Sequence, residues 1–263
     1  GLGLEISKLL VKKGIKVFLT DCNESALRAE ADGLQMPYSF VDVASWESQH
    51  AAFKQAVKAF GRIDYLYPIA GIGENTWIPP PPPGFPADDF VEPNLSIIDI
   101  NVKGFLYTVS LAVQQFRKQP KGYHGFRGKI LSPSSIMGIY PSANNPMYNA
   151  SKHAITGFTR SFGRQLPRED ITMNAFCPSS IKTDFSKESY YNKLEEEDLF
   201  TKIDGVFEVV EKFLGADGTS GECYEIGPSY HKGLGLVKPK FPDYSDEGIR
   251  RVFELIDIRG NAK

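Results

Sequence analysis

The chain has 263 residues, of which 41% are hydrophobic and 24% are charged, and its formal net charge is −2. This length and composition predict a single globular domain, residues 1–263, large enough for one sizeable core. The balanced charge argues against nucleic acid or an anionic membrane surface as a partner, and apolar runs shorter than a bilayer span argue against a membrane protein. Three scattered cysteines argue against a disulfide framework or a metal site and indicate a reduced, cytoplasmic protein.

Helical and strand patterns alternate along the chain. Apolar residues recur at helical spacing in residues 2–13, 52–60, 97–116 and 205–214, and short apolar strands are predicted at residues 15–19, 38–41, 63–69, 129–131, 171–177 and 222–226. This alternation predicts an α/β fold with a doubly wound, Rossmann-type parallel sheet flanked by helices. Pro68 is expected to break the strand at residues 63–69, because proline lacks the N–H group that a central strand donates.

Residues 77–93 form a proline-rich insertion that includes five consecutive prolines, Pro79 to Pro83. Such a run predicts an extended, polyproline-like segment on the surface. The segment is either a rim of a substrate cleft or docking site, or a surface insertion without a role.

A second long helix is predicted to end before Pro167, because apolar residues recur every four positions ahead of that proline. Tyr148 and Lys152 lie near the start of this pattern, and at about 100° per residue they are about 40° apart on one helix face. A nearby ammonium favours the phenolate, so Lys152 is expected to lower the pKa of Tyr148 and make it a general base. Ser135, thirteen residues before Tyr148, is placed to hold a substrate oxygen. The alternative is an ordinary tyrosine at the core boundary and a solvated lysine.

The region after the strand at residues 171–177 is predicted to be a substrate loop at about residues 184–201. Aromatic side chains in it, Phe185 among them, are available to cover an apolar ligand, although a peripheral helix packed by its own aromatics explains the pattern equally well. The C-terminal tail, residues 228–263, contains an amphipathic stretch at residues 247–258 to which we assign no chemistry.

Several of these motifs together resemble the short-chain dehydrogenase/reductase family. They are Ser135, the run Tyr148-Asn149-Ala150-Ser151-Lys152 and the run Gly157-Phe158-Thr159-Arg160-Ser161. The runs from Asn144 to Tyr148 and at Lys152-His153 suggest the branch that contains 15-hydroxyprostaglandin dehydrogenase. The resemblance implies a catalytic tetrad of Asn101, Ser135, Tyr148 and Lys152, in which the backbone carbonyl of Asn101 holds a water. It also implies that Asn145 contacts the substrate.

The resemblance further implies a nicotinamide cofactor. Gly1 and Gly3 match the last two glycines of the family's TGxxxGxG phosphate turn, so we expect that the chain is N-terminally truncated and lacks the first, central strand. Asp21, eighteen residues after Gly3, would bind the adenosine ribose and repel a 2′-phosphate, which favours NAD over NADP. Tyr148 and Lys152 would also contact the cofactor, as would the residues matching the family's adenine and nicotinamide contacts, namely Asp42, Val43, Ala70, Gly71, Ile181 and Thr183. The chain departs from the family at two places. Pro68-Ile69 replaces Asn-Asn, so both asparagine side chains are lost from the cofactor packing, and Ser179 replaces a glycine, which costs the turn some freedom without forbidding it.

The expected function is therefore that of an NAD-dependent oxidoreductase, which interconverts a secondary alcohol and a ketone on a small apolar molecule. By resemblance, a homodimer or homotetramer is expected, paired through the helices at residues 97–116 and 147–166. Two alternatives remain open: a redox-inactive member of the fold retained for binding, and an enzyme that uses the cleft for a non-redox rearrangement.

Overall fold

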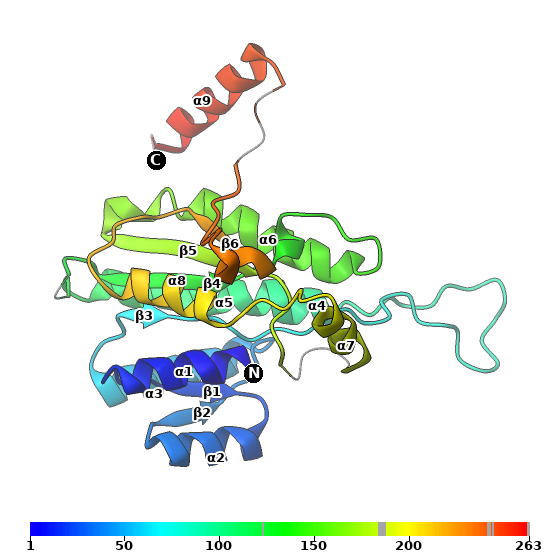
Figure 1. Ribbon diagram of the computed structural model, residues 1–263, viewed down its shortest axis with the longest axis horizontal. Coiled ribbons are helices and arrows are strands. Elements are labelled where there is room, and N and C mark those ends of the chain that lie inside the picture. The colour runs from blue at the N-terminus through cyan, green and yellow to red at the C-terminus, as the bar shows by residue number, and fades with distance from the viewer. Residues whose placement is uncertain (123, 184–187, 241–242, 244, 262–263) are drawn as a thin grey trace.

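The computed structural model describes residues 1–122, 124–183, 188–240, 243 and 245–261. Its strands are all parallel and form two sheets (Figure 1). One sheet pairs β1 (Leu19–Asp21) with β2 (Tyr38–Phe40), and the other runs in the order β3 (Tyr65–Leu66), β4 (Gly128–Pro133), β5 (Ile171–Pro178) and β6 (Cys223–Ile226). Within the described residues, no hydrogen bonds join the two sheets. The α/β class and the parallel strands are confirmed, and the sheet is interrupted between β1 and β3.

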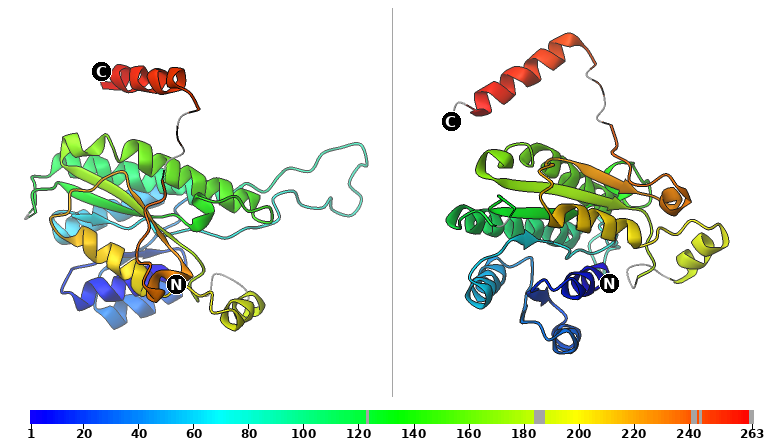
Figure 2. Two further views of the ribbon diagram at one scale, coloured as in Figure 1. Left: turned by 45° about the horizontal axis from the view of Figure 1, so that its top comes forward. Right: turned by 60° about the vertical axis from the view of Figure 1, so that its left-hand side comes forward.

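Helices cover both faces of the larger sheet. The helical elements are α1 (Leu2–Lys12), α2 (Glu24–Leu34), α3 (Trp46–Phe60), α4 (Ser96–Ile98), η1 (Asp99–Gly104), α5 (Phe105–Lys118), η2 (Ile136–Gly138), α6 (Pro146–Phe162), η3 (Leu166–Glu169), α7 (Glu188–Glu196), α8 (Asp204–Leu214), η4 (Pro228–Lys232) and α9 (Glu247–Asn261). Successive strand residues face opposite layers, so Ile130 packs with α5 and α6 while Leu131 packs with α1 and α8. Figure 2 shows the sheet between these helix pairs.

Strand β3 is shorter than its sequence pattern. A strand was predicted at residues 63–69, but pairing with β4 is limited to Tyr65 opposite Lys129 and Leu66 opposite Ile130. The chain then turns, with the Ile69 N–H donating to the Tyr67 carbonyl at 2.9 Å. Pro68 lies in that turn, so the expected break in the ladder is confirmed.

The long helix predicted at residues 97–116 contains a π-helical turn. The turn is η1, Asp99–Gly104, between α4 and α5, and it carries Asn101. By length and composition the helical run at residues 96–118 could cross a membrane, but Phe105, Val109 and Phe116 on its apolar face are buried in the core. Its apolarity is therefore explained by packing against the sheet.

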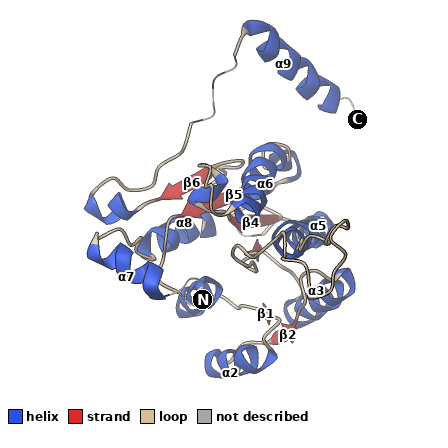
Figure 3. Cartoon of the chain, turned by 90° about the vertical axis from the view of Figure 1, so that its right-hand side faces the viewer, coloured by secondary structure: helices blue, strands red, loops and turns tan. Residues whose placement is uncertain are grey.

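Two segments extend from the body. The proline-rich insertion, residues 77–93, is a long mostly exposed arm without helix or strand, which confirms the predicted extended surface segment (Figures 1 and 2). The Asn94 N–H donates to the Trp77 carbonyl at 2.8 Å and closes the base of the arm. Helix α9 stands apart from the body (Figure 3).

Candidate active site

Ser135 lies just beyond the carboxyl end of β4. Its hydroxyl caps η2, because Ser135 Oγ accepts a hydrogen bond from the Met137 N–H at 3.1 Å. The preceding Ser134 Oγ bonds to the Lys152 carbonyl at 3.1 Å, so this loop is held directly against α6. Ser135 is 9% exposed. A serine hydroxyl is thus fixed at the strand edge where α/β sheets hold their ligands.

Helix α6 carries Tyr148 and Lys152 on one face, as its sequence spacing predicts. Pro146 occupies the first turn, where its missing N–H is no loss. Asn149 Nδ2 donates to the carbonyls of Met137 and Tyr140, at 2.8 Å each, and so ties the helix to the loop that carries Ser135. The hydroxyl of Ser135 is hydrogen-bonded to the phenol of Tyr148. The predicted meeting of these side chains is therefore present in the structure.

Lys152 is buried, with 6% of its surface exposed. Its Nζ donates to the Pro133 carbonyl at 3.0 Å and lies 5.4 Å from the centroid of the Tyr148 ring. Burial lowers the pKa of Lys152 to about 8, with a smaller opposing effect from Cys177. The ammonium and the amine are accordingly both populated near pH 8.

The pKa of the Tyr148 phenol lies above its ordinary value in this structure. Burial raises the pKa of Tyr148 to about 12, and the hydrogen bond from Ser135 opposes that rise only in part. The expected net lowering of this pKa is therefore not found, because the effect of burial is larger. The reason is that the cleft removes water from the phenol, while the lysine that should favour the phenolate is itself partly discharged by burial.

Asn101 acts through its side chain in this structure. Asn101 is 1% exposed, its Oδ1 accepts from the Ile72 N–H at 2.8 Å, and its Nδ2 donates to the Ile72 carbonyl at 2.9 Å and to Ser151 Oγ at 3.1 Å. The amide thus holds the loop after β3 against α6. Its position in a π-helical turn is typical of functional sites. The role predicted for its backbone carbonyl remains a prediction.

Two of the glycines predicted to contact the cofactor lie in close contact with neighbouring segments. A Cβ added at Gly3 would lie 3.4 Å from the Ile69 side chain, and one at Gly71 would lie 3.2 Å from Asn101 Oδ1 and 3.9 Å from Lys152 Nζ. Exposed Gly71 therefore allows a close approach of the backbone to Lys152.

The predicted adenosine side adjoins the same π-helical turn. A Cβ on Gly104, in η1, would lie 2.8 Å from the Val43 carbonyl, and the Val41 N–H donates to the Asp21 carbonyl at 2.9 Å. Asp21 and Asp42 are exposed at the carboxyl ends of β1 and β2. An exposed carboxylate at a strand end can accept hydrogen bonds from a ribose, while the helix start at Gly1 and the Lys152 ammonium can donate to the cofactor, so these groups fit a nicotinamide dinucleotide.

The remaining predicted residues lie at the edges of the site. Ala70 is exposed beside Gly71, whereas Ile181 and Thr183 are half-buried after β5. Asn145 Nδ2 donates to Ser142 Oγ at 3.2 Å, ahead of α6. Phe185 lies outside the described residues, as does part of the predicted substrate loop. Helix α7 forms within that loop, as the second interpretation of its aromatics proposed.

The roles of two residues near the site, Glu74 and Tyr191, could not be predicted from the sequence. Glu74 accepts hydrogen bonds from the backbone at the start of α6. Tyr191, on α7, has its hydroxyl 3.4 Å from both the Thr183 nitrogen and the Ile181 carbonyl, so it holds the segment predicted to contact the nicotinamide. Glu74 acts on residues more than seventy positions away, and Tyr191 acts on residues eight and ten positions away across a loop, so helical periodicity predicts neither contact.

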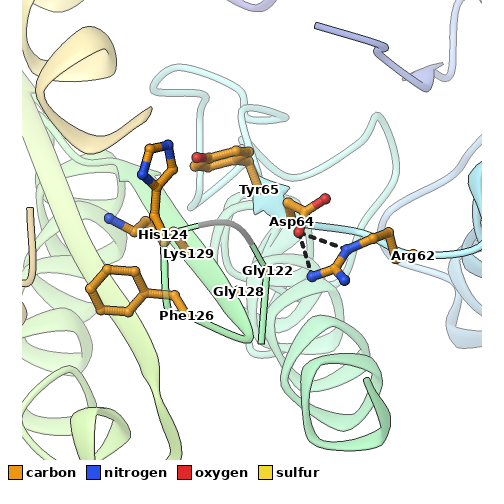
Figure 4. Close-up of a pocket in the computed structure, with 8 residues that line it drawn as sticks. All are labelled: Arg62, Asp64, Tyr65, Gly122, His124, Phe126, Gly128 and Lys129. Carbon is orange, nitrogen blue, oxygen red and sulfur yellow. Dashed lines mark hydrogen bonds and ion pairs between the residues drawn. The ribbon is translucent and has the colours of Figure 1, made fainter. Parts of the chain in front are cut away.

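A cavity of about 370 Å³ lies at the opposite edge of the sheet, at the amino ends of β3 and β4 (Figure 4). Its charged groups bond to the protein itself: Arg62 pairs with Asp64, and Lys129 Nζ donates to the carbonyls of Gly215 and Asp217 at 2.6 and 2.7 Å. Figure 4 shows the guanidinium of Arg62 turned toward Asp64. These bonds join loops together, so we assign the cavity no ligand.

Comparison with known proteins identifies the family of the chain. Residues 1–193 match the family model described as short chain dehydrogenase. The short-chain dehydrogenase/reductase prx7 of Penicillium rubens is 30% identical, over 99% of this chain and 98% of its own. The 15-hydroxyprostaglandin dehydrogenase of Homo sapiens, whose name specifies NAD(+), is 31% identical over 70% of this chain and 65% of its own. The crystal structure of levodione reductase has a TM-score of 0.71 at 22% identity, covering 89% of this chain and 95% of that one, which shows a shared fold.

Proposed function

Since the chain belongs to the short-chain dehydrogenase/reductase family, we propose that it is an NAD-dependent oxidoreductase that interconverts a secondary alcohol and the corresponding ketone on a small apolar molecule. The observation that carries this proposal is the meeting of Ser135, Tyr148 and Lys152 at the carboxyl edge of the sheet. The NAD(+) in the name of the human relative supports the choice of cofactor. Asp21 supports it too, because an exposed carboxylate there repels a 2′-phosphate.

In the direction of oxidation, Tyr148 accepts the proton of the substrate hydroxyl. Ser135 donates a hydrogen bond to the substrate oxygen and holds it beside the phenol. Lys152 supplies positive charge that stabilises the phenolate. A bound nicotinamide supplies the hydride acceptor, together with a positive charge in its oxidised form. Gly71, Asp21 and the start of α1 would hold that cofactor.

The charge of Lys152 accounts for part of the activation that Tyr148 needs. At the 5.4 Å between Lys152 Nζ and the ring centroid, a full ammonium favours the phenolate by about 3 kcal/mol at an effective dielectric constant of about 20. That energy corresponds to about 2 pKa units. Starting from a pKa of about 12, the lysine alone would bring the pKa of the phenol to about 10, so only about 1% of it would be ionised at pH 8.

A panel of small secondary alcohols, assayed with NAD at 340 nm, tests the proposal. Tyr148→Phe should lose nearly all turnover and still bind NADH, because only the proton acceptor is removed. Tyr140→Phe is the matched control, since Tyr140 is 50% exposed and its hydroxyl bonds to Glu225 rather than to the site. Full turnover by the Tyr148 variant would refute the mechanism.

A second candidate is a redox-inactive protein that keeps the fold for binding. The short β3, which ends before Pro68, favours it. Titration of NADH against the purified chain separates the two candidates, because absence of binding at millimolar cofactor would remove the oxidoreductase. Turnover of a substrate without nicotinamide would instead identify a non-redox enzyme.

A further inference from the structure

The first turn of α6 is capped from a distant part of the chain. Pro146 has no N–H, and within the described chain the side chain of Asn145, at the N-cap, makes no capping bond. The next two N–H groups are those of Met147 and Tyr148, and both donate to the carboxylate of Glu74, at 3.4 and 2.7 Å. Helix starts leave such N–H groups without intrahelical partners, and a carboxylate there is favoured by the helix dipole.

The loop that carries Glu74, residues 72–75, is itself held at both ends. At one end Ile72 makes two backbone hydrogen bonds, at 2.8 and 2.9 Å, with the amide of Asn101. At the other end Asn75 Nδ2 donates to Ser96 Oγ at 2.8 Å. Asn101 also donates to Ser151 Oγ on α6 at 3.1 Å. Glu74 is half-buried on a loop that these hydrogen bonds hold in place. Its carboxylate can therefore fix the position of the N–H groups that it accepts from, those of Met147 and Tyr148.

We infer that Glu74 is a positioning residue that sets the place of Tyr148 against Ser135 and Lys152, an inference that rests on the proposed function. The stronger of its two bonds holds the backbone N–H of Tyr148 itself. Tyr148 lies in the first turn of α6, where a helix frays most readily, while Lys152 is one turn further in and bonds to Pro133. Loss of the cap therefore moves the phenol relative to the lysine and the serine.

The test compares Glu74→Ala with Glu74→Gln, and uses Glu92→Ala as the matched control. The glutamine variant keeps an acceptor oxygen for the Tyr148 N–H, and Glu92 is an exposed glutamate on the same connection between β3 and α4. The readouts are amide hydrogen exchange of peptides covering residues 144–151 and 171–178, and kcat and KM on any alcohol that the unsubstituted chain oxidises.

Glu74→Ala should exchange the amides of the first turn at least about tenfold faster, with β5 unchanged, because that turn opens locally. Its kcat should fall about tenfold to a hundredfold, as expected for a misplaced reacting group, while KM for NAD stays within about twofold. Glu74→Gln should recover most of both losses, and Glu92→Ala should match the unsubstituted chain. Recovery by glutamine distinguishes positioning from general destabilisation.

Unchanged exchange in residues 144–151, or an unchanged kcat in Glu74→Ala, would overturn the inference, as would a glutamine variant as impaired as the alanine variant. If Glu74→Ala does not fold, the glutamine variant decides alone: normal exchange with normal kcat supports the inference, and a low kcat with normal exchange overturns it. Failure of the proposed function looks different, since the unsubstituted chain would then oxidise no alcohol while the exchange in Glu74→Ala still rises.

Discussion

Replacement of Lys152 by methionine should make the dependence of stability on pH weaker. Burial lowers the pKa of Lys152 to about 8 in the folded chain, against an ordinary value of 10.5 in the unfolded chain. Below pH 8 both states carry the proton, and the buried charge costs the fold about 3 kcal/mol. Between pH 8 and 10.5 the folded state gives up its proton while the unfolded state keeps it, so stability rises with pH. Above 10.5 the cost is gone.

The difference between Lys152→Met and the unsubstituted chain isolates this effect. Methionine fills a similar volume without charge, but it leaves the Pro133 carbonyl without the bond from Nζ, at a cost of about 1–3 kcal/mol that does not change with pH. The stability of the variant relative to the unsubstituted chain should therefore fall by about 3 kcal/mol from pH 7.5 to 10.5. Both proteins share their other titrating groups, which cancel in the difference.

Urea unfolding followed by circular dichroism at half-unit steps of pH measures that difference. The same pair in a Tyr148→Phe background removes the phenol as a titrating neighbour, whose ring centroid is 5.4 Å from Nζ. A difference that stays constant from pH 7.5 to 10.5 would refute the reasoning, since Lys152 would then titrate alike in both states. In the background that keeps Tyr148, Lys152→Met should also lower kcat about a hundredfold, which is the equivalent of the 2 pKa units by which the ammonium favours the phenolate.

Four further predictions concern single residues. Asp21→Ala should raise KM for NAD and lower KM for NADP, measured as the ratio of kcat/KM for the two cofactors, and an unchanged ratio would contradict the ribose assignment. Ser135→Ala should lower kcat at least about tenfold and move the pH profile to higher pH, because the hydrogen bond that lowers the Tyr148 pKa is lost. In thermal unfolding, Gly157→Ala should stabilise by about 0.5–1 kcal/mol, because it is an exposed mid-helix glycine with open space. Gly128→Ala should destabilise the fold by at least about 1–3 kcal/mol, because its Cβ would overlap the Phe116 ring.

The sequence predicted the helix that carries Tyr148 and Lys152 because helical spacing depends on neighbours a few positions away. It also predicted the break at Pro68, since the missing N–H belongs to that residue wherever it lies. It did not predict the π-helical turn around Asn101, whose pattern resembles that of an ordinary helix. That turn accompanies side-chain bonds from Asn101 to Ile72, twenty-nine positions earlier.

The sequence also did not predict that Glu74 caps α6. Glu74 is seventy-four positions from Tyr148, and a glutamate in a loop is an ordinary surface residue until the fold brings it to a helix start. Nothing in local spacing couples the two residues.

The sequence by itself determined which groups share the site: a phenol and an ammonium one helical turn apart, with a serine hydroxyl at the end of the preceding strand. Helix geometry and strand alternation are local, so these placements follow from residue order. Only the tertiary structure decided the ionisation of those groups. Burial depends on every segment packed around a side chain, and here it raises the pKa of Tyr148 to about 12 and lowers that of Lys152 to about 8, against the direction expected from the pair alone.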